Sequence, residues 1–296
     1  MLSILIPIYN EDVTKLVKDL SYQCNRQKIT YEIICFDDGS RQSYKNKNEV
    51  LRSVFRVNYV EMTENLGRAK IRNWLAKSAS FDHLLFLDGD SRLINKSFIK
   101  NYVEHLPSDK VIVGGRIYKP KQPKNLKKIL HWKYGSTRES LEAVKRQKAG
   151  FIHFHSNNFI IPAATFAKHK FDDAINGYGY EDLVFAQELE ETGHEILHID
   201  NPTKHNKIEN TEAFISKTKE GIENLYKLYT SGRLKSTRLI QTYEKLKKYK
   251  LLGIARKHLS KKVVTYEQNM RSDNPSIIKF NLWKLYQFMT LMENKK

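Results

Sequence analysis

The sequence has little cysteine, proline or glycine, and it has no long apolar run. Its 296 residues include only two cysteines, Cys24 and Cys35, which are too few for the disulfide framework of a secreted protein. Seven prolines and thirteen glycines exclude a collagen-like or low-complexity chain. No stretch approaches the roughly 20 apolar residues of a membrane span, and the N-terminus lacks the features of a signal peptide. We therefore expect a cytoplasmic protein.

Acidic residues are also scarce, since 33 Asp and Glu stand against 51 Lys and Arg and leave a formal net charge of +18. The excess is concentrated in residues 207–296, where 20 basic and 8 acidic residues give +12. Such a charge indicates a polyanionic partner, which can be nucleic acid, an acidic membrane surface or a phosphorylated substrate. The length fits one large domain with an extension, or two small domains.

Short apolar runs alternate with helical patterns in the first part of the chain. The apolar runs predict strands at residues 2–8, 31–36, 54–62, 83–87 and 111–113. Helical spacing predicts helices at residues 11–24, 41–53, 66–79 and 97–106. This alternation predicts βαβ units and a mostly parallel sheet, in which ligands bind beyond the carboxyl ends of the strands.

The remainder is less regular. We expect a basic segment with a helix at about 125–148, strands at 151–161 and 194–199, a helix at about 181–192, and helices from about 211 to the end. His153 and His155 alternate on the first of these expected strands and are interpreted as structural.

Two carboxylates follow the apolar run at residues 83–87, in the motif Asp88-Gly89-Asp90. A divalent cation prefers hard oxygen ligands, and Mg²⁺ commonly uses one or two carboxylates plus substrate phosphates. Gly89 removes side-chain bulk where a diphosphate and a metal must approach. The same residues also suit a polar turn that ends a strand, so this motif alone leaves both interpretations open.

Two further acidic motifs stand beside helical patterns. The run Asp37-Asp38-Gly39-Ser40 suits either hydrogen bonds from a base or ribose hydroxyl or the capping of a helix. The pair Glu181-Asp182 suits either proton removal from an acceptor hydroxyl or the acid enrichment of a helix start. Because the carboxyl ends of parallel strands lie at one edge of a sheet, we predict that the polar groups at residues 9–11, 37–38 and 88–90 converge there.

Together, these motifs resemble those of the family 2 glycosyltransferases, which have the GT-A fold. The resemblance begins at residues 6–11 (Ile-Pro-Ile-Tyr-Asn-Glu), continues through residues 37–40 and 65–73, and includes residues 88–90 and 181–182. It covers about residues 1–205. The loop at residues 175–180 departs from the family's usual pattern, so Tyr178 and Tyr180 suit either stacking on a sugar face or packing.

The resemblance implies an α/β GT-A catalytic domain at residues 1–206, with a nucleotide-sugar-binding half at 1–115 and an acceptor-binding half at 116–206. A basic helical extension then occupies residues 207–296. The nucleotide-sugar site is expected to include Pro7, Tyr9, Glu11, Asp38, Arg68, Lys70 and Asp88. For Lys70, a solvated helix face is an equal alternative.

The resemblance also implies a metal and a catalytic base. Asp90 is expected to bind Mn²⁺ or Mg²⁺, with His205 and Asp88 as further ligands, although a lone histidine can equally be structural. Asp182 is expected to be the general base, and Glu181 to orient hydroxyl groups. The implied reaction is an inverting transfer from a nucleotide-diphosphate sugar, by family habit a UDP-sugar. The implied acceptor is a saccharide or a lipid-linked saccharide in polysaccharide or cell-surface glycan synthesis.

The basic extension leaves two interpretations open. Its apolar patches either lie on an anionic membrane surface, as a peripheral attachment to the inner face of the cell membrane, or pack on the catalytic domain. These patches comprise Leu225, Leu228, Tyr229, Ile278, Leu282, Leu285, Tyr286, Phe288 and Met289.

Other function classes fit the sequence less well. Nucleic-acid binding is disfavoured because no module signature accompanies the positive charge and because carboxylates at the strand ends would repel phosphate. A dinucleotide-binding oxidoreductase is disfavoured because no Gly-x-Gly-x-x-Gly follows the first strand.

Overall fold

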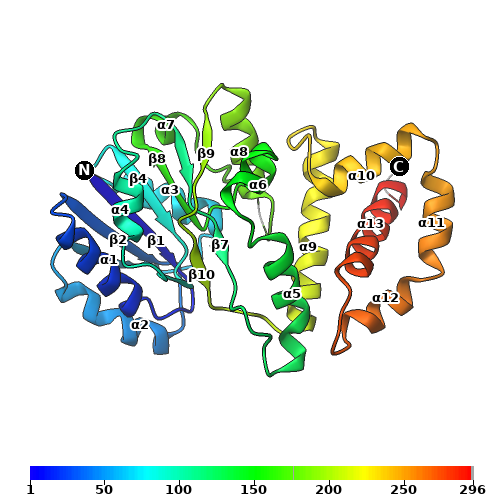
Figure 1. The fold of residues 1–296 in the computed structure, drawn as a ribbon, viewed down its shortest axis with the longest axis horizontal. Helices are drawn as coiled ribbons and strands as arrows, with labels where there is room; N and C mark the ends of the chain where they lie inside the picture. Colours follow the sequence, from blue (N-terminus) through cyan, green and yellow to red (C-terminus); the bar gives the residue numbers. More distant parts are fainter. Residues whose placement is uncertain (176, 295–296) are drawn as a thin grey trace. The chain divides into compact units, whose positions relative to one another are not determined.

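The computed structural model describes residues 1–175 and 177–294, and the chain divides into two compact units (Figure 1). The first, the sheet unit, comprises Met1–Tyr118, Glu139–Asn176 and Glu181–Lys207. The second, the helical unit, comprises Lys119–Arg138, Gly177–Tyr180 and Ile208–Lys296. The functional boundaries predicted from the sequence, 1–206 and 207–296, stay predictions.

A seven-stranded sheet forms the centre of the sheet unit, in the order β3-β2-β1-β4-β8-β6-β9. Only β8 runs antiparallel to its neighbours, β4 and β6. The predicted α/β fold with a mostly parallel mixed sheet is therefore confirmed. The strands are β1 (Leu2–Ile8), β2 (Tyr31–Asp37), β3 (Val57–Glu61), β4 (His83–Leu87), β6 (Val111–Val113), β8 (Asn158–Pro162) and β9 (Ile196–His198).

A second sheet has three very short strands, in the order β5-β10-β7. Its strands are β5 (Ser91–Arg92), β7 (Arg116–Ile117) and β10 (Thr203–His205). No sequence pattern predicts these strands, because two or three residues are too few to show a strand periodicity. This small sheet begins directly after Asp90 and ends at His205, so it bears on the site described below.

Helices flank the central sheet and complete its core. Leu16, Val17 and Leu20 of α1 are fully buried at helical spacing, in one cluster with the apolar side chains of β1 and β2. The helices and 3₁₀ turns of this unit are α1 (Thr14–Arg26), α2 (Gln42–Asn48), η1 (Glu49–Ser53), α3 (Arg68–Lys77), α4 (Phe98–Val103), α6 (Ala143–Gln147), η3 (Gly150–His153), α7 (Ala163–Lys168) and α8 (Glu181–Glu191).

Two predicted elements have different bounds in the structure. The strand predicted at 151–161 begins only at Asn158, because Gly150 has a positive φ of 60° and opens a 3₁₀ turn that contains His153. The helix predicted at 125–148 is divided into η2 (Leu126–Lys128) and α5 (Ile129–Arg138), which belong to the helical unit, and α6, which belongs to the sheet unit.

The helical unit is built around its C-terminal helix. Besides η2 and α5 it contains α9 (Thr211–Thr230), α10 (Arg238–Lys248), α11 (Leu252–Ser260), α12 (Val263–Met270) and α13 (Ile277–Asn294). The side chains of Asn210 and Thr237 cap α9 and α10 by accepting hydrogen bonds from the third residue beyond each cap. Helix α13 packs against α9 and α12.

The apolar patches that the sequence offered as a membrane-facing surface form the interior of this unit for the most part. Leu225, Leu228, Leu285, Phe288 and Met289 are all buried. Within residues 1–175 and 177–294, no helix combines the length and the apolarity needed to cross a bilayer.

Candidate active site

The acidic groups predicted from the sequence follow three neighbouring strands of the central sheet. Strands β2, β1 and β4 are parallel and adjacent, with Ile8 at the end of β1 aligned to Asp37 at the end of β2. Their carboxyl ends therefore lie at one edge. The residues that follow these ends are Glu11, Asp38 and Asp88.

Asp38 fixes the loop that leads into α3. Its two carboxylate oxygens accept hydrogen bonds from the backbone N–H groups of Leu66 at 2.6 Å and Gly67 at 3.1 Å. The side chain of Asn65 donates to the Asp38 carbonyl at 2.9 Å. Burial raises the pKa of Asp38. The two motifs at residues 37–40 and 65–67 therefore form one structure, which places the start of α3 at the sheet edge.

Helix α3 brings two arginines to this edge. Arg68 and Arg72 lie one turn apart on the same helix face. Arg72 is almost fully buried, and its Nη2 donates to Asp88 Oδ1 at 2.5 Å. The Nε of Arg68 lies 2.8 Å from Glu181 Oε1, and its Nη2 lies 4.0 Å from Asp88 Oδ2. Arg68 thus links the carboxyl end of β4 to the start of α8.

Replacing Arg72 with methionine should lower the free energy of unfolding by about 3 kcal/mol, because it leaves the Asp88 carboxylate without its closest partner. This loss of unfolding free energy is at the low end for breaking a buried ion pair, because the side chain of Asp88 is 18% exposed. Urea unfolding measures the change. The double variant Arg72→Met/Asp88→Asn should recover part of the loss, whereas unchanged stability of the single variant would contradict the role of the pair.

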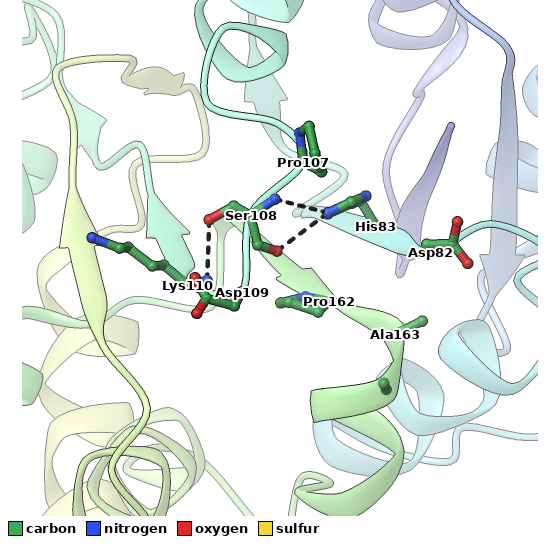
Figure 2. Close-up of a pocket in the computed structure, with 9 residues that line it drawn as sticks. Asp82, His83, Pro107, Ser108, Asp109, Lys110, Pro162 and Ala163 are labelled. Atoms are coloured by element: carbon green, nitrogen blue, oxygen red, sulfur yellow. Dashed lines mark hydrogen bonds between the residues drawn. The ribbon is translucent and has the colours of Figure 1, made fainter.

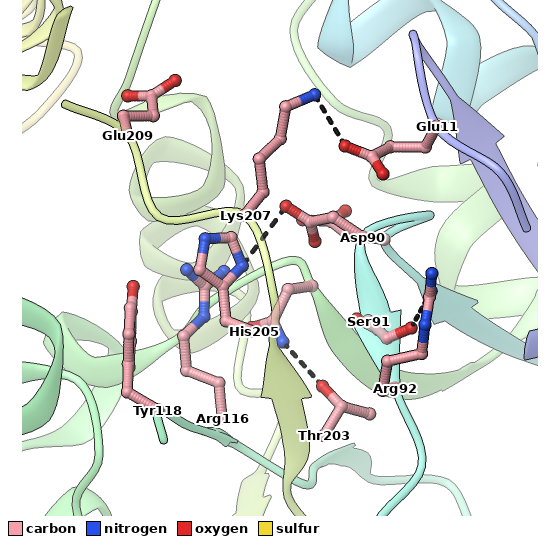
Figure 3. Close-up of polar contacts among 12 residues, drawn as sticks. Glu11, Asp90, Ser91, Arg92, Arg116, Tyr118, Thr203, His205, Lys207 and Glu209 are labelled. Atoms are coloured by element: carbon pink, nitrogen blue, oxygen red, sulfur yellow. Dashed lines mark hydrogen bonds and ion pairs between the residues drawn. The ribbon is translucent and has the colours of Figure 1, made fainter. Parts of the chain in front are cut away.

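Asp90 and His205 form the second charged pair of the site. The Nδ1 of His205 lies 3.2 Å from Asp90 Oδ2, and Figure 3 shows the imidazole facing this carboxylate. The contact follows from the small sheet, in which β10 pairs with β5 so that His205 is aligned with Ser91. Burial by itself raises the pKa of Asp90, but the hydrogen bond and the charge of His205 outweigh it and lower the pKa to about 2.

A buried polar cluster lies beside this pair. The guanidinium of Arg116 lies 3.2 Å from Glu139 Oε2, and Tyr118 donates its hydroxyl to the same oxygen at 2.7 Å. The ring of Tyr118 also lies 5.2 Å, centroid to centroid, from the ring of His205. The positive charge of Arg116 is one of the influences that lower the pKa of Asp90. The cluster therefore packs against His205 through Tyr118 and lowers the pKa of Asp90 through the charge of Arg116.

Glu11 is paired with a lysine that the sequence analysis did not name. The Nζ of Lys207, two residues beyond His205, lies 2.6 Å from Glu11 Oε1, as Figure 3 shows. Of the other predicted donor-site residues, the ring of Tyr9 is 53% exposed. Pro7 lies next to the Asp88-Gly89-Asp90 turn, because a Cβ added at Gly89 would stand 3.1 Å from its carbonyl oxygen. Lys70 is exposed on α3.

Asp182 stands at the start of α8, next to Glu181. Burial and the neighbouring Glu181 carboxylate raise the pKa of Asp182 to about 7, against the lowering influence of arginines that include Arg68 and Arg116. These two arginines also act on Asp90. The predicted base and the predicted metal ligand are therefore influenced by the same two arginines, and Arg68 directly contacts Glu181, the neighbour of Asp182.

Two buried polar atoms near Asp182 lack a hydrogen-bond partner among the described residues. They are the Oε2 of Glu181 and the Nε2 of His155. The Nδ1 of His155 lies 3.9 Å from Asp182 Oδ2. Burial, assisted by the charge of Arg116, lowers the pKa of His155 to about 3, so its ring is neutral.

Six residues described here were not identified as site residues from the sequence. They are Arg72, Arg116, Tyr118, Glu139, His155 and Lys207. Arg72 had a signal, because its spacing of four from Arg68 places both on one helix face. Arg116 follows the carboxyl end of β6, after Gly114 and Gly115, which is the same kind of position as the acidic motifs. Glu139 and His155 had no local signal.

The predicted acceptor-side tyrosines lie in the helical unit. The backbone N–H of Tyr178 donates to Glu220 of α9 at 2.7 Å, and its carbonyl accepts from Asn224 at 3.1 Å. Lys217 lies 5.3 Å from the centre of its ring. Asn176, part of the same predicted loop, lies outside the described residues.

A surface hollow of about 570 Å³ lies at the opposite edge of the sheet (Figure 2). Its lining includes His83 at the start of β4, Lys110 just before β6 and Pro162 at the end of the antiparallel β8. None of the predicted site residues lines it. The acidic edge therefore remains the candidate active site.

Comparisons with known proteins bear on this site and its fold. The family model described as "Glycosyl transferase family 2" matches residues 3–167. Chondroitin synthase of Escherichia coli is 30% identical over 121 residues, which are 40% of this chain but only 17% of the length of that protein.

Solved structures show a similar fold. A mannosyltransferase from Pyrobaculum calidifontis, in complex with GDP-Man and Mn²⁺, has a TM-score of 0.56 and 17% identity over 77% of this chain and 64% of that chain. Residues 1–349 of TarS from S. aureus have a TM-score of 0.52 and 17% identity over 99% of this chain and 90% of that chain. The same fragment in complex with UDP-GlcNAc has a TM-score of 0.51 and 15% identity over 99% and 91%.

Proposed function

The chain belongs to glycosyl transferase family 2, and we propose that it is an inverting, metal-dependent transferase that moves a sugar from a nucleotide-diphosphate sugar to an acceptor hydroxyl. The observation that carries this proposal is that Arg68 contacts Glu181, next to Asp182, and Asp88, in the same turn as the Asp90–His205 pair. The fold is of the GT-A type, with a helical C-terminal part.

The donor is proposed to be a UDP-sugar that carries a hexosyl or N-acetylhexosaminyl group. The TarS fragment binds UDP-GlcNAc, whereas the mannosyltransferase binds GDP-Man, so the solved structures support nucleotide sugars as a class. Asp38 and Glu11 follow adjacent strands, which supports assigning both to the nucleoside. The match to chondroitin synthase supports a saccharide acceptor in polysaccharide synthesis.

The donor atoms at Asp90 and His205 fit a divalent cation. A carboxylate oxygen and an imidazole nitrogen lie 3.2 Å apart, and Mn²⁺ accepts both kinds of donor. Such a cation would take its other ligands from substrate phosphates and water. When bound, such a cation neutralises the charge that develops on the departing diphosphate. Asp88 fits this role less well, because it is paired with Arg72.

The chain's own residues account for the proton and the charge in the proposed reaction. The acceptor oxygen forms a bond to the anomeric carbon while the bond to the diphosphate oxygen breaks, and the electron pair leaves with the diphosphate. Asp182 takes the proton of the acceptor hydroxyl. Glu181 is held by Arg68 through Oε1, and we assign it the orientation of substrate hydroxyl groups. Arg68 offers positive charge toward the leaving diphosphate.

The transfer rate should rise with pH through an apparent pKa of about 7. The pKa of Asp182 is raised to about 7 by burial and by Glu181, and only the ionised carboxylate can accept a proton. Activity should therefore fall about tenfold for each pH unit below that value. Rates measured at saturating donor from about pH 5 to pH 9 test this.

The arginines and the histidine nearest to Asp182 do not produce this dependence of the rate on pH. Arg68, Arg72 and Arg116 keep their charge throughout this range, and His155 stays neutral because its pKa is about 3. A rate that stays constant between about pH 5 and pH 8 would contradict the role of Asp182.

A thermal-shift screen of nucleotide sugars with and without Mn²⁺ tests the donor class. A ligand at 100 times its Kd stabilises a fold by about 2.7 kcal/mol. We expect a UDP-sugar to raise the unfolding temperature, and Mn²⁺ to increase the shift. The absence of any shift across UDP-, GDP- and other nucleotide sugars, with Mn²⁺ present, would contradict the proposed function.

A further inference from the structure

The helical unit carries a concentrated positive charge where α10 passes into α11 and α12. Residues 245–262 contain eight basic side chains and no acidic one. All eight are exposed, and only Lys247 and Arg256 pair with an acid among the described residues, namely Glu244 and Glu293. The eight are Lys245, Lys247, Lys248, Lys250, Arg256, Lys257, Lys261 and Lys262.

Large apolar side chains are exposed in the same segment. Ile254 is 70% exposed, Val264 63%, Tyr249 59% and Leu251 42%. Large apolar side chains are usually buried, although a single exposed aliphatic side chain is common and needs no explanation. What distinguishes these four is that they lie within sixteen residues of one another and alternate with the lysines.

The two faces of α11 have opposite characters. Leu259 is buried, and Leu252 and Ala255 share its face at helical spacing, where α11 packs against α13. Ile254, Lys257 and Lys261 lie at i, i+3 and i+7 on the opposite face. An exposed isoleucine flanked by lysines is typical of a helix that lies in a membrane interface.

We propose that this surface, residues 245–264, binds an anionic lipid bilayer. The lysines are attracted to anionic headgroups, and each strengthens binding about fivefold near such a surface. A soluble polyanion would engage the lysines equally, but it would gain nothing from Ile254, Leu251 and Val264. Their exposure beside the charge is what selects a lipid surface. The proposal does not depend on the reaction assigned to the sheet unit.

Sedimentation with vesicles tests the proposal. The full chain should sediment with phosphatidylcholine vesicles that contain phosphatidylglycerol and not with pure phosphatidylcholine. Replacing Lys248, Lys250 and Lys257 with alanine should weaken binding about 100-fold. Ile254→Ser should weaken it about tenfold without a change of charge, because it removes the inserted apolar side chain.

A matched control removes the same charge elsewhere. Lys18, Lys77 and Lys96 are exposed lysines of the sheet unit, and their triple alanine variant should bind as the unaltered chain does. Circular dichroism checks that every variant is folded. Equal binding by the two triple variants would overturn the proposal. Binding to soluble polyphosphate without binding to anionic vesicles, or full binding by Ile254→Ser, would overturn the choice of a lipid partner.

Discussion

Replacing Asp182 with asparagine should lower the rate of sugar transfer by about 10²–10⁴-fold, which is the usual contribution of a general base. Asparagine has the same shape but cannot take a proton. Donor binding should persist, because the groups assigned to the nucleotide and to the diphosphate are unaltered. Steady-state rates and calorimetric titration of the donor separate the two effects.

The variant should also be at least as stable as the unaltered chain above about pH 7. The pKa of Asp182 is raised to about 7 from an ordinary value of 3.8, so the folded chain binds this proton more tightly than the unfolded chain does. The ionised carboxylate therefore weakens the folded state, and a neutral amide removes that cost. Thermal unfolding at about pH 8 checks this.

A control on the same helix separates catalysis from charge. Glu190 is an exposed carboxylate of α8, and Glu190→Gln should leave the transfer rate within about twofold. If Asp182→Asn kept its turnover, or if both variants lost it equally, Asp182 would not be the base.

Replacing Asp90 with alanine should abolish the Mn²⁺-dependent part of donor binding and lower transfer by about 10²–10³-fold. The variant removes a carboxylate proposed to bind the cation, and losing one preorganised group at a developing charge has an effect of this size. His205 would remain, but its Nδ1 would lose the oxygen 3.2 Å away. Calorimetric titration of the donor with and without Mn²⁺ measures how much donor binding depends on the metal. Electron paramagnetic resonance of Mn²⁺ reports metal binding without any turnover.

Asp19→Ala is the matched control, because Asp19 pairs only with Lys15 on the exposed face of α1 among the described residues. It should leave both readouts unchanged. His205→Ala should reproduce the loss of Mn²⁺ binding in part. If donor binding by the Asp90→Ala variant still responded fully to Mn²⁺, Asp90 and His205 would not belong to the metal site.

Local patterns were enough to predict the central sheet. The apolar runs of β1, β2 and β4 are almost continuous because both faces of these strands are buried, and such runs can be recognised within a few residues. Because parallel strands share a carboxyl edge, the sequence pattern also predicts that Asp38 and Asp88 lie at the same edge. The small sheet was missed, and so were the bounds of the elements between residues 125 and 161, because their apolar periods are too short.

The sequence by itself determined the family, the sheet and the acidic residues at its edge, because each depends on residues close together in the chain. Only the tertiary structure decided which groups act on them. His205 reaches Asp90 through the pairing of β10 with β5, and Arg68 reaches Glu181 across more than a hundred residues. It also decided which apolar side chains of the helical unit are core and which, such as Ile254, are exposed. Such contacts depend on how distant segments pack, and no local pattern encodes that packing.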